Sequence, residues 1–435
     1  MTPAVQKSSE PQDHVLRRAV RPLQEFINTQ EFINTEVLSG LVLLLGAMVA
    51  MAWANSPWDE SYADVFGHHI KVSLPLFHAD ESIQHWINDG LMTLFFFVVG
   101  LEIKRELLRG ELQGVRKAAL PGLAALGGML APALIFTAIN AGGDGAGGWG
   151  IPMATDIAFA LGILAVLGSR VPSSVRVFLL ALAIVDDIGA IAVIAIFYSG
   201  SIQVDSLALA SGLTGLMFGL QRAGVRPMPI YIALGVVAWA ATYESGIHAT
   251  IAGVALGLLT PFEWPGTPRA TDADGKGPLR WLEHNLHPVS SFAIVPLFAL
   301  ANAGVALGPD EVGDSIGSAV TLGVMAGLVI GKPVGIFLLS WLAVRLGVAT
   351  LPEGARWGHI AGVGVLGGVG FTVALFVNEL AFDSAALVND GKIGIIFGSL
   401  VAGVLGVAAL VLAGRPGEGI ATGNNIAVDK ISRQD

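Results

Sequence analysis

The chain has 435 residues, of which only 13% are charged and 53% are hydrophobic, and its mean hydropathy is +0.68. Soluble domains carry roughly 25% charged residues, so this composition excludes a soluble globule, and the abundance of apolar residues excludes intrinsic disorder. The net charge of −10 argues against a nucleic-acid partner, and the absence of cysteine excludes disulfides, thiolate nucleophiles and cysteine-bound metals. The composition therefore indicates a polytopic membrane protein.

Apolar stretches of about 20 residues, long enough to span a bilayer as helices, recur along the chain. We expect an all-α membrane protein with one transmembrane domain, residues 37–414, built from twelve spans. Eleven or thirteen spans stay open, because little more than Glu244, Ser245 and Gly246 separates the seventh from the eighth. The predicted spans are residues 37–54, 88–107, 118–140, 149–169, 175–199, 205–221, 228–244, 246–262, 287–307, 317–344, 358–381 and 391–414.

The placement of lysine and arginine supports this count, because cytoplasmic loops carry an excess of both. With both termini inside, 21 of the 24 basic residues fall in inside segments, Lys71 and Lys392 fall outside, and Lys332 lies within a span. Omission of one span would invert every later loop. We therefore expect cytoplasmic tails at residues 1–36 and 415–435.

Three segments outside the spans have patterns of their own. Residues 24–29 and 30–35 repeat one hexapeptide, which is either a small duplication in the tail or a helix lying on the membrane surface. The outside loop 55–87 contains the alternating run 70–74, so it is either an ordinary ordered loop or a β-hairpin used for self-association. Residues 263–280, rich in proline and glycine, read as a flexible linker between two halves.

Two adjacent aspartates, Asp186 and Asp187, lie at the midpoint of the predicted span 175–199. A charge there costs about 2.5–3.5 kcal/mol on insertion scales and is by default a functional-site hypothesis. Neighbours on a helix point about 100° apart, so both can face a water-filled cavity, and close carboxylates titrate as a coupled pair. A purely structural role would need two basic partners within the membrane, and the chain offers one.

Thr155 and Asp156 follow Pro152 near the middle of the fourth span. This predicts an interrupted helix, whose free backbone groups are tolerated in a membrane where they line a cavity or find partners. The alternative is that Asp156 only caps its own helix. Lys332 lies near the centre of the tenth span and needs a carboxylate as a counter-charge.

The eleventh span contains Gly362, Gly364, Gly367, Gly368 and Gly370 before the run 371–373, which favours a second broken helix or a close helix crossing. Spans four and eleven are each the middle of a three-span group. Two interrupted helices in corresponding positions of two halves are typical of a transporter core with its site between them.

Seven short motifs resemble the NhaA family of sodium/proton antiporters, over residues 36–414. They are WIND at 86–89, VGLEIKREL at 99–107, ATDIAFALG at 154–162, AIVDD at 183–187, SGIHAT at 245–250, LEH at 282–284 with HP at 287–288, and IGKP at 330–333. The resemblance implies inverted repeats in which the broken spans 4 and 11 cross near the bilayer midplane.

The resemblance also implies residue roles. Na+ would bind at Asp186, Asp187 and Thr155, with Asp156 and Lys332 supporting the site and Lys332 paired with Asp186 when both are charged. A pH response would involve a cytoplasmic cluster and one outer residue, namely Glu102, Glu106, Glu283, His284 and, outside, His248. The implied protein is a dimer in the bacterial inner membrane, in contact with membrane lipid, which uses no cofactor and is not an enzyme.

The expected mechanism is competition between Na+ (or Li+) and H+ for the aspartate pair, because these hard cations prefer oxygen ligands. Asp156 would offset the positive ends of the broken helices and Lys332 the negative ends. Two rivals stay open. An intramembrane aspartyl protease would need a Gly-x-Gly-Asp motif, and the nearest string, AGGD at 141–144, lacks the first glycine. A sodium-coupled solute symporter would need a solute cavity.

Overall fold

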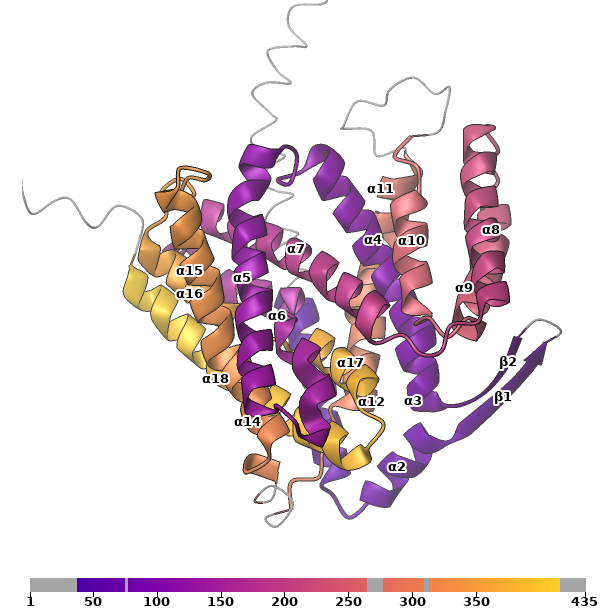
Figure 1. Cartoon of the computed structure of the whole chain (residues 1–435), viewed down its shortest axis with the longest axis horizontal. Helices are drawn as coiled ribbons and strands as arrows, with labels where there is room; N and C mark the ends of the chain where they lie inside the picture. The colour runs from indigo at the N-terminus through magenta and orange to yellow at the C-terminus, as the bar shows by residue number, and fades with distance from the viewer. Residues whose placement is uncertain (1–36, 75–76, 264–276, 309–312, 314, 415–435) are drawn as a thin grey trace, which may run out of the picture.

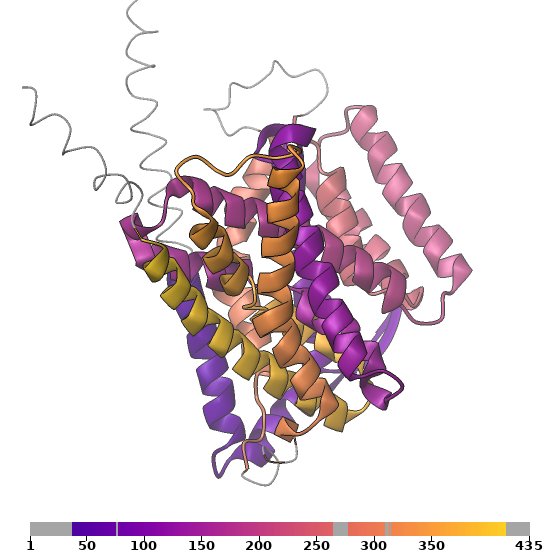
Figure 2. The same ribbon diagram turned by 60° about the vertical axis from the view of Figure 1, so that its left-hand side comes forward.

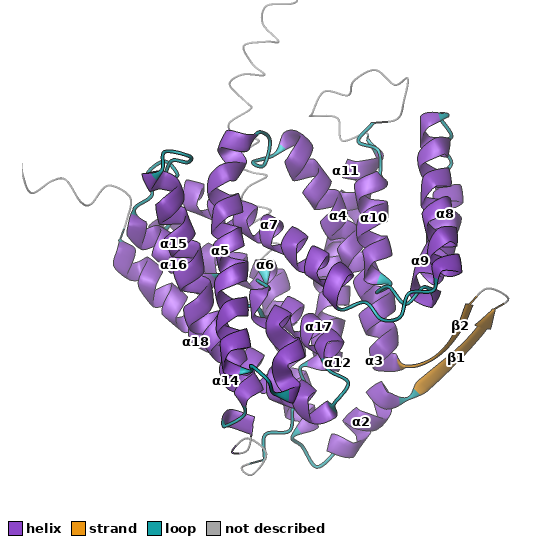
Figure 3. Ribbon diagram, in the orientation of Figure 1, coloured by secondary structure: helices purple, strands orange, loops and turns teal. Residues whose placement is uncertain are grey.

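The computed structural model describes residues 37–74, 77–263, 277–308, 313 and 315–414. Both predicted tails lie outside the described residues, as does most of the predicted linker 263–280. Within the described residues the molecule is almost entirely helical, with one two-stranded hairpin (Figure 3).

The first half of the chain runs through a series of helices and the hairpin (Figure 1). The elements up to the middle of the chain are Val37–Ala54, α2 (Asp59–Gly67), β1 (His69–Leu74), β2 (Phe77–Ser82), α3 (Ile83–His85), η1 (Trp86–Leu91), α4 (Met92–Arg109), α5 (Val115–Ile139), η2 (Asp144–Met153), α6 (Ile157–Leu167), η3 (Gly168–Arg170), α7 (Ser173–Phe197), α8 (Val204–Arg222) and α9 (Met228–Glu244).

The second half has the same helical character. Its elements are α10 (Thr250–Leu259), α11 (Pro278–Val289), η4 (Ser290–Ile294), α12 (Val295–Asn302), α14 (Ala319–Ala326), η5 (Gly327–Gly331), α15 (Lys332–Arg345), α16 (Trp357–Leu366), α17 (Phe371–Ala381) and α18 (Ala385–Ala413). Each of the twelve predicted spans contains a helix, although the eighth, predicted over 246–262, is a helix of only ten residues.

Six of the described helices are long and apolar enough to cross a membrane. Two further helix pairs meet this test together but are bent at short breaks, by 42° between η2 and α6 and by 46° between α16 and α17. These breaks fall within the fourth and eleventh predicted spans. By length and hydropathy alone the described part of the chain therefore holds six to eight candidate spans.

Two helix pairs pack closely because glycines lie where the backbones meet. An added Cβ on Gly331, at the end of η5 directly before α15, would lie 2.6 Å from Cα of Pro132 in α5. On Gly100 of α4 it would lie 2.8 Å from the carbonyl oxygen of Val254 in α10. In both overall views α5 and α15 run side by side (Figures 1 and 2). Small residues thus set the spacing between these helices.

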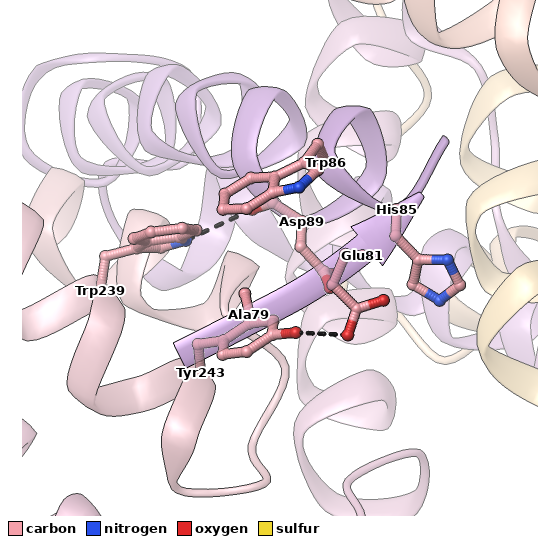
Figure 4. Close-up of a pocket in the computed structure, with 7 residues that line it drawn as sticks. All are labelled: Ala79, Glu81, His85, Trp86, Asp89, Trp239 and Tyr243. Carbon is pink, nitrogen blue, oxygen red and sulfur yellow. Dashed lines mark hydrogen bonds between the residues drawn. The ribbon is translucent and has the colours of Figure 1, made fainter. Parts of the chain in front are cut away.

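The hairpin is antiparallel, with His69 opposite Ser82 and Leu74 opposite Phe77. Its second strand is anchored on α9. The Tyr243 hydroxyl donates to Glu81 Oε1 at 2.7 Å, and the Trp239 indole N–H lies 3.3 Å from the carbonyl oxygen of Asp89, around a small recess (Figure 4). The hairpin is therefore held against α9 by its contact with Tyr243.

Candidate functional site

The two bent helix pairs meet at their breaks. The Asp156 N–H donates to the carbonyl oxygen of Val369 at 2.7 Å, and an added Cβ on Gly370 would lie 3.0 Å from the carbonyl oxygen of Ala154. Residues more than 200 positions apart in the chain thus satisfy one another's free backbone groups. This is how an interrupted helix end is stabilised without water.

The local sequence explains both breaks. The first arm, η2, is rich in glycine and contains Pro152, and both residue types are poor helix formers. Asp156 then adopts an extended conformation and starts α6. In the second pair, α16 ends at the run Gly367-Gly368-Val369-Gly370, where three glycines in four residues remove the propensity to continue. Each break therefore follows from composition.

A buried ion pair lies beside these breaks. Lys332 Nζ contacts Asp186 Oδ2 closely and donates to Thr155 Oγ1 at 2.6 Å, and the three side chains are at most 1% exposed. Thr155 Oγ1 also lies 2.7 Å from Asp186 Oδ2 and 3.0 Å from the carbonyl oxygen of Gly367. The other oxygen of the aspartate, Asp186 Oδ1, is buried and has no hydrogen-bond partner among the described residues.

Lys332 is the first residue of α15 and directly follows an irregular turn. The π-helical turn η5 ends at Gly331, directly before the lysine, and Pro333 follows it. Proline has no N–H to donate to the preceding turn, so the regular helical ladder is interrupted there. Single π-helical turns of this kind occur frequently at functional sites.

Asp187 is also buried, at 6% exposure, and its carboxylate makes no hydrogen bond or ion pair within the described residues. Its electrostatic neighbours are three carboxylates, Asp186, Glu102 and Asp156, and one cation, Lys332. The structure buries both side chains of the pair, Asp186 at 1% and Asp187 at 6% exposure, and the water-filled cavity beside them stays a prediction.

Asp156 links both breaks. Its Oδ1 accepts the N–H of Phe159 at 3.0 Å, which caps α6, and its Oδ2 accepts the N–H and the hydroxyl of Thr372 at 3.1 and 2.5 Å, at the start of α17. The alternative in which it caps only its own helix is thus too narrow. Thr372 was missed as a site residue, although its place after the glycine run was the signal that could have identified it.

The predicted cytoplasmic residues Glu102, Glu106 and Glu283 gather where α11 packs on α4. Arg105 lies between the acids, in close contact with Glu283 and 2.9 Å from Glu106 Oε1. Burial raises the pKa of Glu283, and the neighbouring arginine opposes this rise. Arg105 is thus a functional candidate that the sequence reasoning left out.

His284 does not belong to this cluster. Its side chain is exposed, while His287, one turn after Glu283, places Nε2 3.6 Å from Glu102 Oε1. Residues four apart share a face of a helix, whereas adjacent residues point about 100° apart. The spacing to Glu283 would have selected His287 over His284. His248 lies in the turn between α9 and α10, where its Nε2 contacts the carbonyl oxygen of Tyr198 at the end of α7.

The family described as Na+/H+ antiporter 1 matches residues 30–410. The chain belongs to this antiporter family. It is 45% identical over 443 residues to "Na(+)/H(+) antiporter NhaA 2" of Sorangium cellulosum, covering 94% of this chain and 93% of the relative. It is 48% identical over 396 residues to "Na(+)/H(+) antiporter NhaA" of Bordetella parapertussis, covering 90% and 97%. These matches confirm the family resemblance drawn from the motifs.

A third relative, "Na(+)/H(+) antiporter NhaA" of Vibrio vulnificus, is 46% identical over 370 residues, covering 84% of this antiporter-family chain and 91% of the relative. The matched range contains both breaks, the aspartate pair and Lys332. Among the described residues no group of three or more His, Cys, Asp or Glu side chains is arranged to hold a metal ion.

Proposed function

We propose that this chain exchanges cytoplasmic Na+ or Li+ for external H+, by competition of the two ions for Asp186 and Asp187. The observation that carries the proposal is the Asp186 Oδ1 atom without a hydrogen-bond partner beside Asp187, whose carboxylate makes no hydrogen bond within the described residues, at the point where two helix breaks meet. Thr155 and backbone carbonyls at the breaks would complete an oxygen site for the cation. The relatives' names support Na+/H+ exchange.

Charge balance gives the physical reason for competition. Three buried carboxylates, Asp156, Asp186 and Asp187, face one ammonium, Lys332. A buried carboxylate without a counter-charge is costly, so the group binds either a proton or a metal cation. If the pair releases two protons when one Na+ enters, each cycle moves net charge. The exchange is then electrogenic, and a proton gradient drives Na+ out.

We propose the fine architecture on the same basis. The chain would form twelve spans with both termini in the cytoplasm. It would lie in the bacterial inner membrane, surrounded by lipid. The two bent pairs would be broken spans 4 and 11 of inverted repeats, which would put their meeting point near the bilayer midplane. The anchored hairpin would supply the dimer contact, which the mass of the purified protein with and without residues 69–82 measures.

Everted vesicles from an antiporter-deficient strain test the function. With this chain expressed, Na+ or Li+ should collapse a respiration-driven proton gradient, and growth in high Na+ should be restored. The sodium-coupled symporter is the alternative, and it would instead show Na+-dependent solute uptake without proton movement. A protein present in the membrane that moves no protons in response to Na+ would contradict the proposal.

Glu283→Gln should shift the pH profile of exchange toward alkaline pH by about 0.5–1 unit, with an unchanged maximal rate. Because the pKa of Glu283 is raised, the carboxyl ionises only as pH rises through that raised value, and its pair with Arg105 forms there. Glutamine is neutral at every pH and cannot form this charged pair, so exchange should start at a higher pH. His284→Gln is the matched control and should leave the profile unchanged. Superimposable profiles for all three proteins would show that the cluster is only a solvated loop contact.

A further inference from the structure

His359 is a buried histidine outside the exchange site. It is the third residue of α16, the first arm of the second bent pair, and its side chain is 0% exposed. Its Nδ1 accepts the backbone N–H of Arg356, the N-cap residue directly before α16, at 3.0 Å. Its Nε2 lies 3.1 Å from the carbonyl oxygen of Gly414, just past the end of α18. One imidazole thus joins two helix ends.

These two partners define the state of the ring. A backbone N–H can only donate, so Nδ1 must be unprotonated, and a carbonyl can only accept, so Nε2 must carry the proton. The ring is therefore neutral, with its hydrogen on Nε2. A second proton on Nδ1 would face the Arg356 N–H and remove the acceptor that caps α16.

The two contacts of the His359 ring, with the Arg356 N–H and the Gly414 carbonyl oxygen, are called the clip below. The helix that begins at this clip ends at the exchange site. α16 has ten residues, a length of about 15 Å, and is followed by Gly367, whose carbonyl oxygen accepts the Thr155 hydroxyl. Glycines of both helices line the contact between α16 and α18. An added Cβ on Gly358 would lie 3.2 Å from Cβ of Ala413, and on Gly406 it would lie 3.1 Å from Cα of Leu366. The position of α16 on α18 therefore determines where Gly367 lies.

The charged side chains at this end of the neighbouring elements are few. Within the described residues they are Arg176 on α7, Arg345 at the end of α15, and Glu353 and Arg356 in the segment that leads into α16. Arginine stays protonated at all relevant pH values. The carboxylate of this set, Glu353, is exposed. The ring itself is thus the group whose change of state can open the clip.

We infer that His359 is a positioning residue for ion exchange, which holds α16 against α18 only while its imidazole is neutral, and which releases α16 on protonation. This rests on the proposed function, because it assigns the clip to the exchange path through Gly367. It adds a pH-sensitive element to the broken helix itself, apart from the cluster around Glu283.

Two variants separate the parts of this inference. Glutamine is the usual third residue of a helix capping box, accepts a backbone N–H, and stays neutral at every pH. His359→Gln should therefore keep the maximal exchange rate within about twofold and move the acid limb of the pH profile by roughly half a unit to lower pH. His359→Leu keeps bulk but leaves two buried backbone groups unpaired, so exchange should fall roughly tenfold at all pH values.

Exchange is measured in everted vesicles at matched protein amounts. If exchange by His359→Gln declines at low pH over the same range as in the parent, the requirement for a neutral ring is overturned. If His359→Leu exchanges ions at the parental rate, the positioning role is overturned.

Amide hydrogen exchange of the purified proteins provides a readout independent of transport. Protection at residues 356–360 should fall with falling pH in the parent but not in His359→Gln. Parental and glutamine proteins with the same pH dependence of protection would overturn the clip. If the parent moves no ions at all, the proposed function fails, and this measurement still decides the clip.

Discussion

Asp187→Asn should reduce Na+-dependent proton movement in everted vesicles to the background rate, with normal amounts of protein in the membrane. The carboxylate of Asp187 makes no hydrogen bond or ion pair among the described residues, so the substitution breaks no contact of the fold. It removes a buried negative charge that makes no ion pair within the described residues, so the free-energy cost of burying this side chain falls. What is lost is the capacity to bind a proton or a cation.

Asp186→Asn is the informative companion, because the fold depends on Asp186 in a different way. Its loss leaves Lys332 buried without a carboxylate partner, and removal of one member of a buried pair costs about 3–5 kcal/mol. This variant should lose both exchange and thermal stability, whereas Asp187→Asn should lose exchange alone. Robust exchange by Asp187→Asn would remove the basis of the competition mechanism.

Asp156→Asn should lower exchange roughly tenfold and reduce thermal stability by about 1–2 kcal/mol. The aspartate carboxylate accepts three hydrogen bonds, from the Phe159 N–H and from the N–H and hydroxyl of Thr372, at the positive ends of two helices. In asparagine one oxygen becomes an NH2 group, which faces donors and carries no charge. The two helix starts then lose their shared anion.

Thr372 provides the matched controls for Asp156. Thr372→Ser keeps the hydroxyl that donates to Asp156 Oδ2 and should behave as the parent. Thr372→Val keeps the shape, loses the donor and should fall between the parent and Asp156→Asn. Initial rates and thermal unfolding of the purified proteins measure both effects. Unchanged folding and transport in Asp156→Asn would show that compensation of the helix ends by this carboxylate is wrong.

The buried charges at the site were predictable from the sequence because a membrane span penalises each of them. Asp156, Asp186, Asp187 and Lys332 stand out against apolar neighbours, and the structure brings all four to one place. The hairpin and both bends were also signalled, by alternation in 70–74 and by glycine and proline at the breaks. Local composition is enough for such features.

Contacts between distant segments were harder to predict. Nothing in one sequence states that the carboxylate of Asp156 reaches Thr372, because that pairing depends on how two breaks meet in space. Arg105 and His287 were overlooked for the related reason that their partners lie on another helix. The count of twelve spans stays a prediction, since length and hydropathy support six to eight among the described residues.

The central claim is that Na+ and H+ compete for the same buried carboxylates. Calorimetric titration of the purified protein with Na+, repeated in buffers of different ionisation enthalpy, measures the protons released per Na+ bound. The competition account predicts release of one to two protons per Na+, weaker Na+ binding as pH falls, and loss of both in Asp187→Asn. Na+ binding that releases no protons and keeps its affinity as pH falls would contradict it.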